Sequence, residues 1–229
     1  RGSCTGESGG GTKTAIRSHE VPAGMKILLV STQDYLHHPV PSRHHYIFEE
    51  LARRHEIHVP HFHVSRGGER STRLVVHEAT RFPLGNPLLH YTLNAPTHFR
   101  VLEEIVRDCG IEVVVASHIL AGMAVIRAAR RHHVPVVFDL KDWFPDSAAA
   151  YYRNPVARRL IREAVWYVTR RNMDRSDRIT TVSPSLVGRL RSLGYDATLV
   201  MNGVDTDRFA PQDGGPMREK LGIGKAEFV

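Results

Sequence analysis

The chain alternates between short, continuously apolar runs and longer segments whose apolar positions recur every three or four residues. The short runs are typical of strands buried on both faces of a parallel sheet, and the periodic segments are typical of amphipathic helices. Strands are expected at residues 26–32, 56–64, 73–77, 111–116, 134–140, 178–182 and 198–201. Helices are expected at residues 42–54, 97–110, 120–132, 155–173, 184–193 and 217–221.

The alternation of strands with helices predicts an α/β fold with a Rossmann-like, doubly wound parallel sheet. Ligands of such open sheets bind beyond the carboxyl ends of the strands. This rule directs attention to the segments after Thr32, Leu140 and Val182. Several prolines and a glycine between residues 83 and 96 predict a loop.

Three parts can be distinguished along the chain. Residues 1–24 are rich in glycine, serine and threonine and lack apolar periodicity, which predicts a disordered leader. Residues 25–211 contain every expected strand and form the expected Rossmann-like domain. Residues 212–229 predict a linker with a short helix, leading to a second domain that the sequence does not include.

The composition is that of a globular domain, with 229 residues of which 41% are hydrophobic and 7% aromatic. A formal net charge of +7 and a pI of about 9.7 favour anionic partners. The two cysteines, Cys4 and Cys109, do not suggest a disulfide framework and fit a reducing compartment. The most apolar stretch, residues 113–126, is too short to span a bilayer. These features predict a cytoplasmic protein.

The loop after the first strand leads to Ser42, Arg43 and His44 at the start of a helix. Without a G-x-G-x-x-G pattern, a nicotinamide or flavin site is not expected there. Free backbone N–H groups at a helix N-terminus can bind an anion, and Arg43 adds a positive charge. The alternative is an ordinary surface helix capped by Ser42.

A second candidate site follows the apolar run 134–140, where Asp139, Lys141 and Asp142 are closely spaced. Carboxylates can orient sugar hydroxyls, and a lysine can stabilise phosphate charge. The large rings of Trp143 and Phe144 beside these charges indicate a shaped pocket. The alternative is a polar connection between a strand and a helix.

Two further candidate binding positions lie in the last part of the chain. Ser183 follows a strand and precedes a helix, so it can line the cleft or serve only as a helix cap. Asn202 and Gly203 follow the last strand, and this pair readily supplies the positive φ of a tight turn.

Residues 153–175 carry seven arginines against Glu163 and Asp174, a net charge of +5. The apolar positions of this helix form one stripe, which is expected to pack on the core beneath a solvated basic face. The alternative is docking on anionic lipid, with Trp166 and Tyr167 near the headgroups.

Three of the fifteen histidines form the pattern His58-x-x-His61-x-His63. On a strand, His61 and His63 share a face, which would suit Zn²⁺. No cysteine is near them in the sequence and Pro60 disturbs the strand. They are therefore interpreted as incidental surface histidines, and no metal or cofactor is expected.

Three motifs resemble those of retaining GT-B glycosyltransferases of the family-four type. Ser42-Arg43 is similar to the start of the first-helix signature, although Val40-Pro41 stands where relatives usually carry Gly-Gly. Residues 139–147 are similar to a D-x-K-D-x-x-P-D-S segment of transferases acting on lipid-linked acceptors. Residues 202–211 are similar to the N-G-V-D-x-x-x-F-x-P signature at the junction of the two domains.

The resemblance implies the N-terminal, acceptor-binding half of a GT-B enzyme, with a cleft on whose rim Ser42, Asp142 and Ser183 converge. Asp142 would be the main catalytic residue, assisted by Lys141, where many relatives carry histidine. The residues expected to bind substrates are Ser42, Arg43, His44, Asp139, Ser183, Asn202 and Gly203.

The reaction implied is transfer of a sugar from a nucleotide-sugar donor to a glycan or lipid-linked acceptor, with retention and without an essential metal. The donor would bind mainly to the second domain, so the chain alone would be inactive. Two alternatives remain: a fragment of a GT-B-type sugar-nucleotide epimerase, and a non-catalytic module that binds an acceptor or a partner. No nucleic-acid-binding motif accompanies the basic charge.

Overall fold

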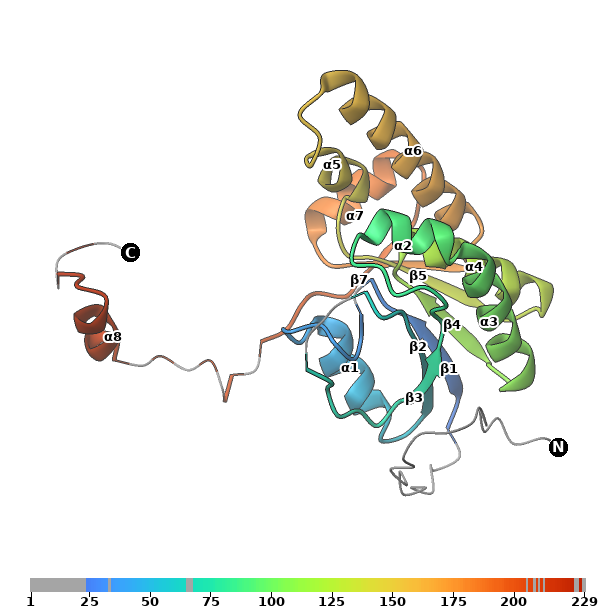
Figure 1. Ribbon diagram of the computed structural model, residues 1–229, viewed down its shortest axis with the longest axis horizontal. Helices are drawn as coiled ribbons and strands as arrows, with labels where there is room; N and C mark the ends of the chain where they lie inside the picture. The colour runs from blue at the N-terminus through green and yellow to red at the C-terminus, as the bar shows by residue number, and fades with distance from the viewer. Residues whose placement is uncertain are drawn as a thin grey trace.

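The computed structural model describes residues 24–32, 34–64, 68–204, 206–207, 209, 211, 213–224 and 227, so the expected leader lies outside the described residues apart from Gly24. A seven-stranded sheet runs through the molecule in the order β3-β2-β1-β4-β5-β6-β7 (Figure 1). Every neighbouring pair of strands is parallel, which confirms the predicted α/β, Rossmann-like fold. The strands are β1 (Lys26–Val30), β2 (Glu56–His61), β3 (Val75–Glu78), β4 (Val113–Ala116), β5 (Val136–Leu140), β6 (Arg178–Thr181) and β7 (Thr198–Leu199).

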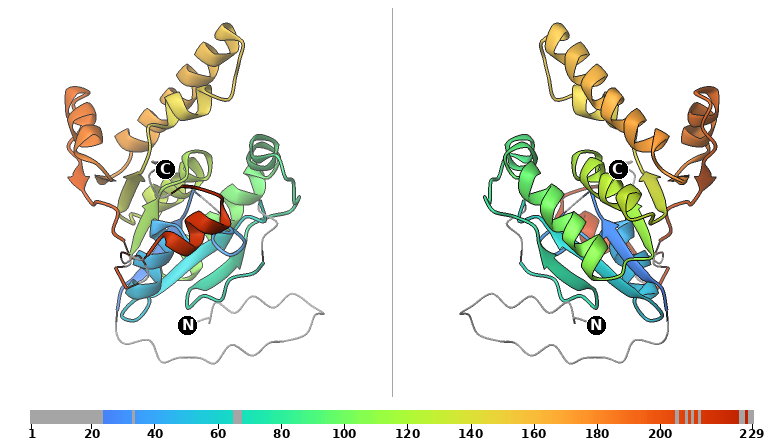
Figure 2. Two further views of the ribbon diagram at one scale, coloured as in Figure 1. Left: turned by 90° about the vertical axis from the view of Figure 1, so that its left-hand side faces the viewer. Right: turned by 90° about the vertical axis from the view of Figure 1, so that its right-hand side faces the viewer.

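Helices lie against both faces of the sheet (Figures 1 and 2). On the face covered by α1, Ile27 and Leu29 of β1 join a small core. On the face covered by α3, α4 and α6, Leu28 and Val30 join a larger one. Alternate side chains of β1 thus serve opposite cores, which is why this strand is continuously apolar. The helices are α1 (Arg43–Leu51), α2 (Pro87–Leu93), α3 (Ala95–Asp108), α4 (Ile119–Arg131), α5 (Phe144–Ala149), α6 (Pro155–Asp174), α7 (Pro184–Ser192) and α8 (Gly215–Lys220).

Two short helices form where the sequence predicted none. The expected loop at residues 83–96 contains α2, whose N-cap Asn86 accepts a hydrogen bond from the Leu89 N–H. Similarly, α5 begins directly after Trp143 and carries Pro145 in its first turn. Proline fits the first turn of a helix because its missing N–H would have no partner there. Pro87, which indicated a loop, therefore marks the start of a helix.

The long basic helix α6 packs on the core only near its end. Its 20 residues span about 30 Å, whereas the four residues of β6 span about 13 Å, so the helix is longer than the sheet is deep. With α5, its first half projects past the sheet (Figure 2), and Val156 and Leu160 are 66% and 64% exposed. The buried residues of α6 are Thr169, Asn172 and Met173. The expectation that the whole apolar stripe packs on the core is wrong for this first half.

Candidate functional site

A buried polar network at the carboxyl edge of the sheet centres on Asp139, near the end of β5. Its Oδ2 lies 3.0 Å from His44 Nε2 and 3.1 Å from Ser117 Oγ. Its Oδ1 lies 2.9 Å from Thr180 Oγ1 and 3.3 Å from Arg43 Nη1. One carboxylate therefore ties β5 to β6, to the start of α1 and to the residue that follows β4.

The protonation states of this network follow from its geometry and burial. An ionised carboxylate can only accept hydrogen bonds, so His44 donates from Nε2 and accepts at Nδ1 from Ser31 Oγ, 3.0 Å away. Burial lowers the pKa of His44 more than Asp139 raises it. Burial would raise the pKa of Asp139, but the hydrogen bond from His44 and the charge of Arg43 lower it. A charged Asp139 is thus held by a neutral imidazole and a guanidinium.

The structure brings together three of the residues selected from the sequence: Arg43, His44 and Asp139. The side chains of His44 and Asp139 are almost completely buried. Sequence reasoning missed the hydroxyl groups that complete the network. They belong to Ser31, Ser117 and Thr180. Their positions in the sequence could have indicated them, since each is a small polar residue at or just beyond the carboxyl end of a strand.

Lys141 and Asp142 lie above this network, where β5 passes into α5. Lys141 is half-buried, and burial lowers the pKa of its ammonium group although Asp139 opposes that effect. Asp142 is exposed, and its carboxylate accepts hydrogen bonds from the Trp143 N–H at 2.7 Å and from Ser147 Oγ at 2.7 Å. The first turn of α5 therefore fixes an exposed carboxylate on the rim.

An aromatic and cationic layer supports this rim from behind. The Arg189 guanidinium lies 3.7 Å from the centre of the Trp143 ring, and Trp166 packs on the same ring with a centroid distance of 5.3 Å. Trp166 thus packs against a neighbouring ring of the protein, whereas the alternative of lipid docking placed it near the headgroups. The Asp146 carboxylate forms ion pairs with Arg162 and Arg189. These contacts join α5, α6 and α7 beside Asp142.

Ser42 and Ser183 both occupy N-cap positions, at the starts of α1 and α7. The Ser42 N–H donates to His45 Nδ1 at 2.8 Å, and Ser183 Oγ accepts from the Leu186 N–H at 3.3 Å. Each of these helices follows the carboxyl end of a strand, as does Asp142. Because β1, β5 and β6 are parallel members of one sheet, all three residues lie along its carboxyl edge.

The predicted turn at Asn202 and Gly203 is not formed. Both residues are exposed, neither has a positive φ, and residues 201–204 carry no turn. An Asn-Gly pair permits a tight turn, but a turn forms where the following segment pairs back on the preceding strand, and here the chain runs away from the sheet toward α8 (Figure 1). Asp205 and Arg208 of the same motif lie outside the described residues.

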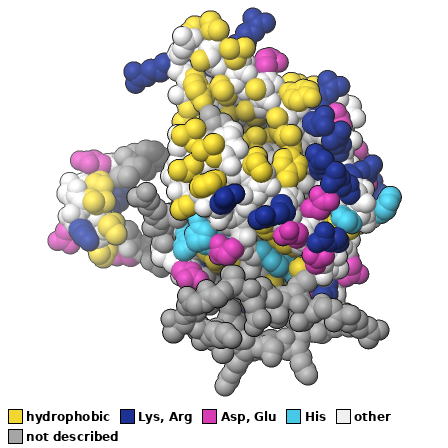
Figure 3. Space-filling view, turned by 45° about the vertical axis from the view of Figure 1, so that its right-hand side comes forward, with side chains coloured by type: hydrophobic (Ala, Val, Ile, Leu, Met, Phe, Trp, Pro, Cys, Tyr) yellow, Lys and Arg dark blue, Asp and Glu magenta, His cyan; other side chains and the backbone are white. Residues whose placement is uncertain are grey.

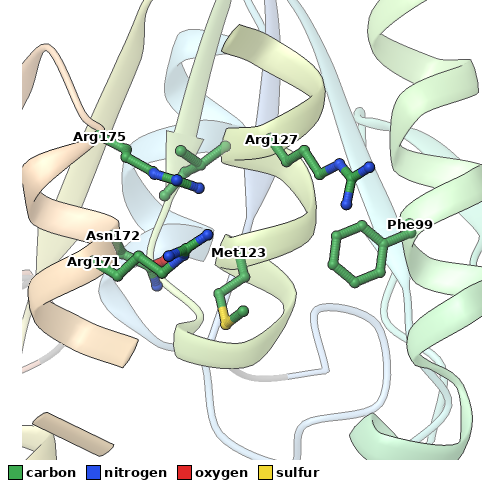
Figure 4. Close-up of a pocket in the computed structure, with 7 residues that line it drawn as sticks. Phe99, Met123, Arg127, Arg171, Asn172 and Arg175 are labelled. Carbon is green, nitrogen blue, oxygen red and sulfur yellow. The ribbon is translucent and has the colours of Figure 1, made fainter. Parts of the chain in front are cut away.

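A small pocket lies elsewhere, between α3, α4 and α6, and has a volume of about 80 Å³ (Figure 4). Arg171 approaches it from α6 and Arg175 from the C-cap of that helix, whereas Arg127 lies on α4 with its guanidinium 5.6 Å from the centre of the Phe99 ring. Its lining residues include no acidic side chain. The pocket belongs to the helical layer rather than to the carboxyl edge, so we do not associate it with the candidate site.

Comparison with known proteins gives the site its context. The family described as Glycosyltransferase Family 4 matches residues 43–208. Sucrose-phosphate synthase from Thermosynechococcus elongatus superimposes with a TM-score of 0.67 at 14% identity, covering 89% of this chain and 54% of that protein. Anabaena HepE in complex with UDP and glucose superimposes with a TM-score of 0.55 at 16% identity, covering 86% and 50%.

This chain therefore spans about half the length of these solved structures. At such low identity the comparison shows only that these structures share the fold of this chain. The ligands bound to them are properties of those proteins. No match was found among curated proteins. Within the part of the chain that the structure describes, no helix combines the length and the apolar character needed to cross a membrane.

Proposed function

This chain belongs to Glycosyltransferase Family 4, and from that membership we propose that it forms the acceptor-binding half of a sugar-transfer site. The observation that carries the proposal is the rim above Asp139, where Asp142 is exposed and Lys141 is half-buried beside it. The network below joins four parts of the fold, namely β5, β6, the start of α1 and the residue after β4. A rigid support of this kind is what orientation of two substrates requires.

We propose that Asp142 accepts a hydrogen bond from an acceptor hydroxyl. Its carboxylate is already oriented by the Trp143 N–H and the Ser147 hydroxyl, so little conformational entropy is lost when a hydroxyl binds. The ammonium group of Lys141, one residue away, would stabilise the negative charge that develops on a departing diphosphate. Burial around Lys141 strengthens that interaction because water screens it less.

The donor in this proposal is a nucleotide sugar, held mainly by a second domain that faces the carboxyl edge. Two observations support it: the chain spans half of its structural relatives, and HepE was solved with UDP and glucose. The acceptor would be a glycan or a lipid-linked sugar, and the new bond would retain the donor's anomeric configuration.

Turnover of nucleotide sugars tests this function. We expect a protein that joins this chain to its donor-binding half to release nucleoside diphosphate only when an acceptor is present, and NMR of the product to show the donor's anomeric configuration. The 229-residue chain alone should release none. Transfer by the chain alone, or conversion of the donor into an epimer without transfer, would contradict the proposal.

The projecting end of α6 suggests how such an enzyme would reach a lipid-linked acceptor. Figure 3 shows hydrophobic side chains gathered over the upper part of the molecule, with Lys and Arg side chains at its top. We propose that this end docks on anionic membranes, its apolar side chains entering the interface and its arginines pairing with headgroups. The exposed apolar side chains of this end are Tyr151, Val156 and Leu160, and Tyr167 is exposed further along the helix. The arginines of this half are Arg153, Arg158, Arg159 and Arg162.

Vesicle sedimentation tests the docking. The chain should bind phosphatidylglycerol vesicles but not phosphatidylcholine vesicles, and binding should weaken as salt rises from 0.05 to about 0.5 M. Leu160→Asp and Arg158→Glu should each reduce the bound fraction several-fold, whereas Arg191→Glu on α7 should have little effect. Binding that is insensitive to salt, or equal in all variants, would refute the docking.

A further inference from the structure

Three imidazoles gather at the carboxyl edge of the sheet, at the end of β2, which β1 and β4 separate from the strand of Asp139. His61 is the last residue of β2, His63 follows it, and His37 belongs to the loop between β1 and α1. One ligand atom from each lies within 4.8 Å of the other two. The ring centroids of His61 and His63 are 3.6 Å apart, and those of His37 and His61 are 4.8 Å apart. Surface histidines were expected here from the sequence, but His61 is only 3% exposed.

Two nitrogens of this cluster are buried without a hydrogen-bond partner: His37 Nδ1 and His61 Nε2. Buried polar atoms in folded proteins nearly always have a partner, and the exceptions need an explanation. Two such nitrogens in one group of three imidazoles indicate a ligand that accepts electron pairs from both, which a metal ion does.

Carboxylates surround the cluster in the arrangement that supports metal-binding histidines. Glu78 reaches His61 Nδ1 at 3.0 Å through one oxygen and His63 Nε2 at 2.7 Å through the other. Each of these imidazoles therefore has its second nitrogen left to bind an ion, with Glu78 fixing the ring orientation. Asp34 Oδ1 lies 3.5 Å from His61 Nε2.

We propose that His37, His61 and His63 bind a zinc ion, with Asp34 as the fourth ligand and Glu78 orienting two of the imidazoles. Bonds of about 2.0–2.1 Å in a tetrahedral site place ligand atoms about 3.3 Å apart, so the three nitrogens must draw together by at most about 1.5 Å. Small rotations of the imidazoles achieve this. Three nitrogens and a carboxylate suit zinc better than magnesium or calcium, which prefer oxygen.

The site would act on the structure of the candidate cleft rather than on the reaction. Its ligands join the β1–α1 loop to the end of β2, and that loop leads into Ser42 and Arg43. Zinc would therefore fix the loop that carries the start of α1 toward Asp139. A second group, formed by His58, His77 and Cys109, is a weaker candidate. In that group His58 Nδ1 already lies 2.8 Å from His77 Nε2, and His58 Nε2 lies 2.8 Å from Glu56.

Zinc titration of the chelator-treated chain, followed by calorimetry, tests the proposal. We expect one Zn²⁺ per chain and a rise in the thermal midpoint with zinc concentration. Co²⁺ should bind competitively and give the visible absorption of a tetrahedral site. His63→Asn is the first variant, because His63 has a φ of 45° that asparagine tolerates and its side chain is 41% exposed. It should weaken zinc binding at least tenfold, and so should His37→Ala.

The control variants are His132→Ala, on a helix cap away from the cluster, and His77→Ala in the second group. Both should bind zinc like the parent chain, and all variants should keep the parent's circular dichroism spectrum. If one of the two test variants fails to fold, the other still gives the answer. Parent-like affinity in the variant that folds would overturn the proposal, as would loss of binding in His77→Ala, or the absence of saturable binding to the parent chain.

Discussion

Replacing Asp139 by asparagine should destabilise the fold while leaving its shape almost unchanged. Asp139 accepts hydrogen bonds from four groups, two of them on Arg43 and His44. Asparagine keeps one acceptor oxygen and turns an NH₂ group toward donors that then lack a partner. It also leaves the Arg43 guanidinium, whose side chain is 11% exposed, without its ionic partner.

The expected loss in the free energy of unfolding comes mainly from the uncompensated charge of Arg43. Breaking a buried ion pair from one side costs about 3–5 kcal/mol, against a total stability of about 5–15 kcal/mol for a domain. We expect a loss of about 3 kcal/mol because Arg43 can still turn partly toward water. With a urea slope of about 2 kcal/mol/M, the unfolding midpoint should fall by about 1.5 M.

Urea unfolding followed by circular dichroism measures this loss, with Asp196→Asn as the control. Asp196 is an exposed carboxylate in the connection before β7, and its change should cost less than about 0.5 kcal/mol. A double-mutant cycle with Arg43→Leu should return a coupling energy of at least about 1 kcal/mol. A loss below about 1 kcal/mol for Asp139→Asn, or no coupling with Arg43, would refute the view that this carboxylate holds the rim.

Three other predictions concern stability. Burial lowers the pKa of His77 and His98 to about 4 and of His118 to about 3, below the unfolded value of 6.5, so the unfolded chain binds more protons. Stability should therefore fall as pH drops from 6.5 toward 4, by about 1.4 kcal/mol per pH unit for each histidine, and urea midpoints that stay constant over this range would contradict this. Asn154→Ala removes the cap that accepts from two N–H groups of α6 and should cost about 1 kcal/mol in the same assay, whereas a cost near zero would show that α6 is frayed. Gly110→Ala forces a residue with a side chain to adopt a φ of 67° and should cost about 1 kcal/mol, measured as a lower thermal midpoint.

The sequence was sufficient for the sheet because its strands are short apolar runs separated by amphipathic helices. Prediction from the sequence failed where the same residue type is compatible with two different local structures. Pro87 indicated a loop but occupies the first turn of α2, and Asn202-Gly203 permits a turn that the fold does not use. The length of α6 relative to the sheet is a property of the assembled fold, so its projecting end was not predictable from periodicity.

The sequence predicted where the candidate site lies more accurately than which side chains contact one another there. The carboxyl-end rule placed Asp139 and the start of α1 at one edge, and the structure joins them. The sequence did not show that Asp139 is buried, nor that Ser117 and Thr180 complete its hydrogen bonds, because these depend on strand order and register. The histidine cluster was missed for the same reason, since His37 is distant in sequence from His61 and His63.

The most direct test of the proposed function is the effect of Asp142→Ala on sugar transfer by the protein that includes the donor-binding half. Asp142 is exposed and its contacts are confined to the first turn of α5, so its removal should leave the fold intact. We predict that kcat/KM for the acceptor falls at least tenfold, or about 1.4 kcal/mol, while Asp196→Ala retains the parent's rate. Parent-like transfer by Asp142→Ala would show that the rim above Asp139 does not carry the reaction.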